Sequence, residues 1–243
     1  MNRIFCIIIT TIYFQLNASA QSKLGGGLKF GYYFNNSFMV EKLVNGTYIH
    51  STSDGLDGFK VDAFLDFPIT NRFVLSGEFS HSWNIGMTGP IIQLENTTAS
   101  SDPSTWLIST SPSFNTLELH SKLRFKLSRY VEPFVGLGIL RLTNFERSSF
   151  TYLDEEEFDE ELREEVRRIN YQNELVASVE NCYRNWTLVN SLGVRFRFKR
   201  LLLDAIYERT ITPVSKNLIF RDQSYSFVQH MDRLSIMFGY KLF

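Results

Sequence analysis

Two short stretches carry residue types that acid–base or nucleophilic chemistry would use. His81 and Ser82 are neighbours, and histidine with serine is the base–nucleophile pair of many acyl-transfer enzymes. Adjacent residues of a strand point to opposite faces, so His81 cannot activate Ser82 there. His120 lies between Glu118 and Lys122 on one polar face, where a structural histidine is the simpler interpretation. We therefore expect no catalytic residues and no enzyme activity.

The remaining candidates for ligand or metal chemistry are isolated. His50 and His230 stand alone, and Cys182 has neither a second cysteine nor a histidine paired with it. No phosphate-binding loop, calcium-loop spacing or other metal-ligand spacing is present. The formal net charge of −1 provides no strong basic field. We expect no metal site, no cofactor and no nucleic-acid partner.

An acidic segment, Asp154 to Ile169, is the one departure from strand-like patterning. Its apolar residues recur at helical spacing: Phe158, Leu162, Val166 and Ile169. Asp154 and Glu157 match an N-cap and its capping partner, and basic residues occupy the last turn. The pattern predicts a short amphipathic helix. Its carboxylates are candidates for binding divalent cations or a partner protein, or its apolar stripe simply packs on neighbouring structure.

The polar face around His120 belongs to a strand pattern that recurs along the chain. In the stretch from Phe114 to Lys126, odd positions from 117 on are almost all apolar and even positions from 116 on are polar or charged, which is the period of a β-strand. The pattern predicts seven further strands, at 24–34, 57–67, 72–83, 131–143, 186–198, 201–211 and 230–243.

The connections between these eight strands alternate between long and short. The long ones are 35–56, 84–113, 144–185 and 212–229, and the short ones hold a few residues each. The first long one is also compatible with a strand extension near Thr47 to His50. This rhythm is typical of outer-membrane barrels, which have short periplasmic turns and long outer loops. The sequence therefore predicts an all-β fold, an eight-stranded antiparallel up-and-down transmembrane β-barrel with a short helix in one long outer loop.

Alternation alone does not decide which face looks inward. The polar faces carry clustered charges of both signs, for example Lys60, Asp62, Glu118 and Arg195, and an eight-stranded barrel has room inside only for side chains. Aromatic residues gather near the strand ends, as interfacial girdles do. We therefore expect the charges inside as a paired network and the apolar faces toward lipid.

The first residues resemble a secretory signal peptide. A basic start at Arg3 precedes an apolar run of about 13 residues, shorter than the roughly 20 of a membrane-spanning helix, and Ala18-Ser19-Ala20 matches a cleavage site. The expected organisation is a signal peptide at 1–20 and an outer-membrane barrel domain at 21–243.

These features together resemble a known group. The leader ending in Ala20-Gln21, the eight strands and the terminal run Gly239-Tyr240-Lys241-Leu242-Phe243 are similar to the small outer-membrane β-barrel proteins of Bacteroidota, the PorT-like or OmpA-transmembrane-like set. The resemblance implies a bacterial outer-membrane location and recognition of the terminal aromatic by the barrel-assembly machinery. Phe243 departs from the usual pattern, because it is out of phase with Tyr240.

Three functions are compatible with such a chain. The first is a non-catalytic outer-membrane barrel that serves as envelope scaffold or binds partners through its outer loops, in contact with outer-membrane lipid and lipopolysaccharide. The second is a lipid-modifying enzyme on the same barrel, although no histidine–serine–acid set is evident. The third is a secreted soluble barrel with an apolar ligand inside, which requires the opposite facing. We favour the first.

Overall fold

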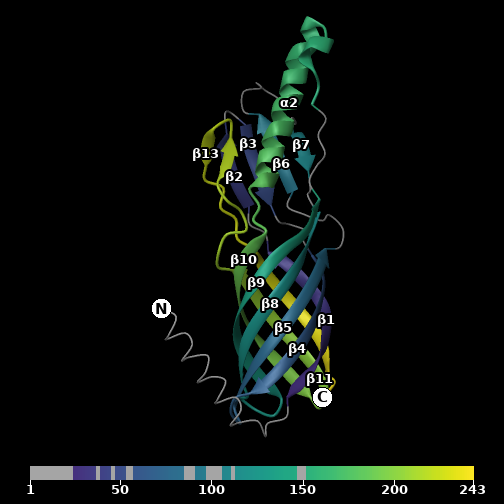
Figure 1. Cartoon of the computed structure of the whole chain (residues 1–243), viewed down its shortest axis with the longest axis vertical. Coiled ribbons are helices and arrows are strands. Elements are labelled where there is room, and N and C mark those ends of the chain that lie inside the picture. The colour runs from purple at the N-terminus through teal and green to yellow at the C-terminus, as the bar shows by residue number, and fades with distance from the viewer. Residues whose placement is uncertain are drawn as a thin grey trace, which may run out of the picture.

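The computed structural model describes residues 24–36, 39–44, 47–52, 57–84, 91–96, 106–110, 113–146 and 152–243. Eight of its strands form one closed antiparallel barrel, in the order β1-β14-β11-β10-β9-β8-β5-β4, with β1 paired to β4 to close it (Figure 1). Their bounds are β1 Gly25–Asn36, β4 Gly58–Pro68, β5 Phe73–Asn84, β8 Ser113–Phe125, β9 Val131–Glu146, β10 Trp186–Phe198, β11 Leu201–Thr210 and β14 Asp232–Lys241.

The predicted eight-stranded barrel is confirmed, and each predicted strand end lies within three residues of the observed one. The three short connections join neighbouring strands by local hydrogen bonds. The Thr70 hydroxyl accepts from the Phe73 amide at 3.0 Å, and the Ser128 hydroxyl accepts from the Val131 amide at 3.1 Å. Lys199 adopts a positive φ of 57° in the two-residue turn between β10 and β11, as tight hairpins require.

The barrel is polar inside and apolar outside, as predicted. Along β4, buried and exposed residues alternate strictly from Gly58 to Leu65. Lys60 and Asp62 are fully buried, whereas the intervening Val61 is 39 % exposed. The other barrel strands repeat this arrangement, so the closed sheet has a charged lumen and an apolar outer wall.

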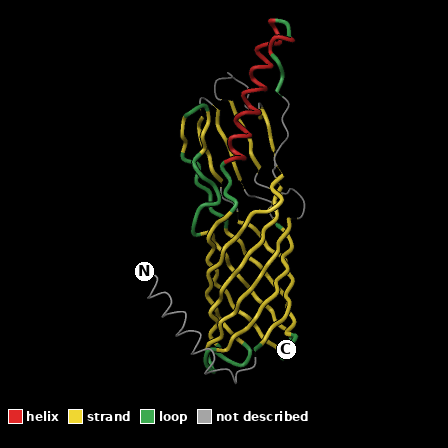
Figure 2. The backbone as a smooth tube through the Cα atoms, in the orientation of Figure 1, coloured by secondary structure: helices red, strands yellow, loops and turns green. Residues whose placement is uncertain are grey.

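The four long connections were predicted to be loops, apart from the helix and a strand extension near Thr47. This prediction was wrong, because the connections hold more secondary structure than these two elements. Each contains secondary structure, and together they build one cap at the end of the barrel away from both described chain ends (Figures 1 and 2). Strands β2 (Met39–Val44), β3 (Thr47–Thr52), β6 (Ile91–Asn96) and β7 (Trp106–Thr110) form a four-stranded sheet in which β3 pairs with β6. Strands β12 (Leu218–Phe220) and β13 (Gln223–Tyr225) form a hairpin.

The predicted helix is present but longer and displaced along the chain. A 3-10 turn, η1 (Glu155–Glu157), precedes helix α2 (Glu160–Asn181). Asp154 does act as a cap, accepting from the Glu156 amide, but it caps η1, and α2 starts after Asp159. The prediction stopped at Ile169 because the charged residues end there, yet helical apolar spacing continues beyond it through the rest of α2.

The carboxyl half of α2 packs into a hydrophobic core to which three of the four long connections contribute, 35–56, 144–185 and 212–229. Val176 and Val179 are fully buried there, together with core residues Val44, Ile49, Leu175, Cys182, Leu218, Phe220 and Phe227. The amino half extends away from the barrel, beyond the cap sheet (Figure 2). No helix among the described residues is both long and apolar enough to cross a membrane. The predicted signal peptide lies outside the described residues.

Because the cap has its own core, it should be destabilised without loss of the barrel. We expect Leu175→Ala, at a fully buried site, to cost about 2–5 kcal/mol of cap stability by leaving a cavity. Leu162→Ala is the matched control on the same helix, because Leu162 is 53 % exposed. Amide hydrogen exchange on α2 measures the difference, and equal exchange in the two variants would contradict a cap core centred on the carboxyl half.

Candidate functional site

The most densely built polar site in the described chain is the barrel lumen. Twelve charged side chains of the barrel strands are buried there, six cationic and six anionic. They are Lys29, Lys60, Lys122, Arg124, Arg195 and Arg233, with Asp62, Glu78, Glu118, Glu132, Asp204 and Glu208. Each lies within 3.1 Å of an opposite charge, so none of these twelve side chains is buried without a charged partner.

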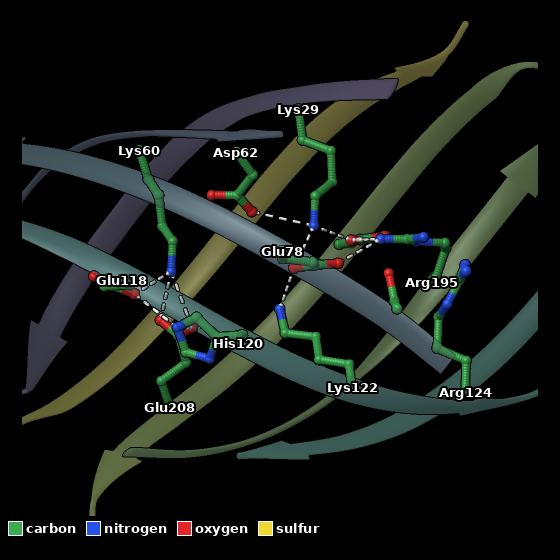
Figure 3. Close-up of polar contacts among 12 residues, drawn as sticks. Lys29, Lys60, Asp62, Glu78, Glu118, His120, Lys122, Arg124, Arg195 and Glu208 are labelled. Carbon is green, nitrogen blue, oxygen red and sulfur yellow. Dashed lines mark hydrogen bonds and ion pairs between the residues drawn. The ribbon is translucent and has the colours of Figure 1, made fainter. Parts of the chain in front are cut away.

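The middle tier of this network centres on Glu78 (Figure 3). Its carboxylate accepts from Lys29 Nζ at 2.8 Å, from Lys122 Nζ at 2.6 Å and from Arg195 Nη2 at 3.1 Å. Arg195 also makes a two-pronged contact with Asp204, both distances being 2.7 Å. Such bidentate pairs are the strongest class of charge-assisted hydrogen bond, and this one joins directly opposed residues of the neighbouring strands β10 and β11.

The tier nearer the cap centres on Glu118. Arg233 donates to its two oxygens at 2.6 and 2.7 Å, and Lys60 Nζ lies 2.8 Å from one of them. Glu208 shares both cations, at 2.7 Å from Arg233 and 2.9 Å from Lys60. His120 Nε2 lies 2.9 Å from Glu118, which makes this histidine a member of the network. A third tier near the short turns links Arg124 to Glu132 at 2.8 Å and to Asp66.

Glycines on the inner face leave room for these long side chains, and an aromatic ring packs against one of them. Lys122 is paired across strands with Gly136, and His120 with Gly138. A Cβ at Gly136 would stand 2.7 Å from Lys122 Cγ, and one at Gly138 would stand 2.6 Å from His120 Nδ1. Phe64 lies under the Arg195 guanidinium, 5.0 Å from ring centre to charge, a favourable cation–π distance.

An apolar cluster closes the lumen beneath the cap. Leu140, Val189 and Met231 are buried there with Leu142 and Val214, and the half-buried Tyr183 packs against them. Val214 comes from the connection between β11 and β12, so part of a long connection folds over the barrel mouth. The lumen is therefore filled along its length by side chains.

The structure brings together one set of potential metal ligands that sequence spacing did not indicate. Donor atoms of Glu118, His120 and Glu208 all lie within 4.8 Å of one another. Glu118 and His120 are two residues apart on β8, but Glu208 arrives from β11 across the lumen, which only barrel closure could show. The carboxylate oxygens are already engaged by Lys60 and Arg233, so a cation would have to displace a buried ammonium or guanidinium.

The other residues considered for chemistry are separated from one another. Ser82 is buried inside and hydrogen-bonded to the Thr116 hydroxyl, whereas His81 is half-buried on the outer face, 3.1 Å from the Thr116 carbonyl. His230 Nδ1 lies 3.0 Å from the Thr210 carbonyl, and the side chain of His50 lies outside the described part. The two faces thus keep His81 and Ser82 apart.

Cys182 ends α2 within the cap core. Its thiol donates to the Ser178 carbonyl at 3.2 Å. Burial raises the pKa of this thiol to about 12, so the reactive thiolate is scarce at neutral pH.

Comparison with known proteins finds structural similarity only. No family model matches the chain, and no curated protein matches it. The attachment invasion locus protein Ail of Yersinia pestis is 12 % identical with a TM-score of 0.40, over 91 % of this chain and 100 % of that one. Neisserial surface protein A is 10 % identical with a TM-score of 0.40, over 90 % and 97 %. A de novo designed transmembrane β-barrel is 12 % identical with a TM-score of 0.36, over 91 % and 98 %. These values assign no family, and the resemblance to the Bacteroidota set stays a prediction.

The lumen network should be sensitive to removal of a single charge. We expect Glu118→Gln to cost about 3–5 kcal/mol in the free energy of unfolding, because Arg233 and Lys60 then lose a buried partner. Urea unfolding of the protein in lipid or detergent measures this cost. Glu165→Gln is the control, since its pair with Arg168 is half-exposed and contributes little. Equal midpoints for both variants would contradict a structural role of the network.

Proposed function

We propose that this chain is a non-catalytic, integral protein of the bacterial outer membrane, in which a filled barrel anchors an exposed cap that binds partners. The observation that carries the proposal is the inverted burial of the barrel. A charged lumen and an apolar outer wall are the arrangement that a strand-built membrane protein needs, and the reverse of a water-soluble barrel.

The apolar wall encircles the barrel and has no covering element in the described chain. Its members are among the largest apolar side chains and are about half exposed: Leu28, Phe30, Leu65, Phe79, Leu119, Leu123, Val135, Leu137, Leu192, Ile236 and Phe238. Exposed apolar residues on soluble proteins are scattered or confined to one patch. Strands of this length, tilted by about 40°, span an apolar layer of ~25 Å.

Aromatic rings mark both rims of this wall. Near the short turns, the rings of Phe73 and Phe125 are 5.3 Å apart, and Tyr130 stacks on Phe198 at 5.8 Å. Near the cap, Phe59 packs against Tyr32 at 5.8 Å and Trp83 at 6.1 Å. Two aromatic girdles flanking an apolar band are typical of transmembrane barrels, because amphipathic rings favour the membrane interfaces.

The cap is then the part of the protein that binds partners. The lumen is occupied by paired charges and closed by the Leu140 cluster, so the described barrel offers neither an open channel nor an apolar cavity. The secreted barrel that binds an apolar ligand inside is not supported, since its cavity would have to lie where the twelve charges lie. The proposed contacts are outer-membrane lipid and lipopolysaccharide along the wall, the assembly machinery during insertion, and a partner at the cap.

Fractionation with a gel-shift assay tests the membrane assignment. We expect the protein in the outer-membrane fraction and faster migration of the unboiled sample, because a closed barrel resists detergent until heated. A soluble periplasmic or secreted protein without a heat-dependent shift would overturn the proposal.

A single charge on the wall provides an energetic test. We expect Leu119→Arg to cost about 2–4 kcal/mol in the free energy of unfolding, since Leu119 is 61 % exposed on the wall and lies midway along β8, between the two aromatic rims. Leu127→Arg, in a short turn, is the matched control with an expected cost of about 0–1 kcal/mol. Reversible unfolding in lipid measures both. Equal stability of the two variants would show that position 119 does not face the bilayer.

A further inference from the structure

A pocket of about 470 Å³ lies on the cap, beside the middle of α2. This volume is within the ~300–1,000 Å³ range of small-molecule sites. Its floor is one helical face, with Arg167, Arg168, Tyr171 and Glu174 at successive turns. One wall is the segment from Tyr152 to η1, and Arg221 of the β12–β13 turn forms the other.

Specific contacts hold both walls against the helix. The Asn170 side chain accepts from the Leu153 amide at 3.0 Å and donates to the Leu153 carbonyl at 2.8 Å. On the opposite side, Arg221 donates to Glu174 at 2.9 Å and stacks over the Tyr171 ring at 4.9 Å. The pocket is therefore assembled from connections that precede and follow β10 and β11, and it exists only in the folded cap.

The chemistry of the lining combines guanidinium groups, carboxylates and aromatic rings. Three arginines face two carboxylates, which leaves one net positive charge. Arg167 is tied to Glu155 at 2.7 Å, and Arg221 to Glu174. Arg168 has only a half-exposed pair with Glu165, outside the lining, so its guanidinium is the group most available to an incoming carboxylate.

The aromatic residues extend this surface. Tyr152 is 56 % exposed and offers a flat face at the pocket edge. The Tyr171 hydroxyl is shielded from solvent and has no hydrogen-bond partner among the described residues. Flat rings beside planar amide, carboxylate and guanidinium groups suit a ligand with apolar C–H faces and many hydroxyls, which is the chemistry of a sugar ring.

The surroundings limit the charge of such a ligand. The segment from Asp154 to Glu165 next to the pocket contains nine acidic residues and one arginine. These carboxylates would repel a long polyanion, whereas a ligand with one carboxylate matches the single net positive charge of the lining.

We propose that the pocket binds a saccharide end that carries one carboxylate, a terminal uronic-acid type of sugar. Arg168 receives the carboxylate, and Tyr152 packs against a ring face. This inference rests on the proposed function, because an external saccharide reaches the pocket only when the cap faces outward.

Titration calorimetry on the full chain in detergent tests the inference with three probes. They are cellobiouronate, with a terminal glucuronate; cellobiose, its neutral counterpart; and polyglucuronate, the same acid as a long polyanion. We expect cellobiouronate to bind at least tenfold more tightly than cellobiose, and polyglucuronate to bind no more tightly per chain end than cellobiouronate. Binding of cellobiouronate should weaken as salt rises.

Variants then place the site. We expect Arg168→Gln and Tyr152→Ala each to weaken cellobiouronate binding at least tenfold. Arg209→Gln is the control, a half-exposed arginine of β11 that is outside the lining and pairs with Asp232, and it should change the dissociation constant less than twofold.

Several results would overturn the inference. They are absence of cellobiouronate binding, equal binding of cellobiose, tighter binding of polyglucuronate per chain end, or an equal loss in Arg209→Gln. Absence of binding would leave the cap as a protein-binding surface. The heat-dependent gel shift of each variant separates this result from failure of the barrel, since a shifted protein that binds no saccharide refutes the pocket alone.

Discussion

Neutralisation of charge inside the barrel is the constraint on which the rest of this structure depends. A closed eight-stranded sheet has a narrow lumen, and unpaired ions buried there would cost several kcal/mol each. Six cations meet six anions, and glycines such as Gly136 and Gly138 leave room for the long side chains. Because the lumen takes the charged residues, the outer face of every strand is left free to be apolar. The apolar outer wall and the filled interior are thus two consequences of one alternation.

The same network ties together strands that are distant along the chain. Glu118 of β8 contacts Lys60 of β4 and Arg233 of β14, while Arg195 of β10 contacts Glu78 of β5. These contacts cross the lumen and add to the backbone ladder that closes the sheet. A filled cylinder of this kind suits an anchor better than a channel. Its end beneath the cap holds eight strand ends, and the four long connections join these in pairs.

The cap is built on those strand ends. The cap is held together by contacts between connections. Strand β3 of the first connection pairs with β6 of the second, and α2 buries Val176 and Val179 against residues of the first and fourth connections. Apolar residues therefore gather at two places, on the outside of the barrel and inside the cap. In the proposed membrane setting the hydrophobic effect accounts for both, because lipid surrounds the barrel wall and water surrounds the cap. The acidic amino half of α2, the arginine–tyrosine pocket and the exposed loop residues are presented on this second core.

The sequence by itself determined the eight strands, the composition of their two faces and the presence of a helix in the third long connection, because alternation and helical spacing are set by neighbouring residues along the chain. The helix end was placed too early, since Leu175 and Val176 continue its apolar stripe without the charges that had marked it. Only the tertiary structure decided that Glu208 joins Glu118 and His120, that three of the long connections share one core, and that Arg221 completes a pocket on α2. These contacts depend on strand register and barrel closure, which bring together residues that no local pattern relates.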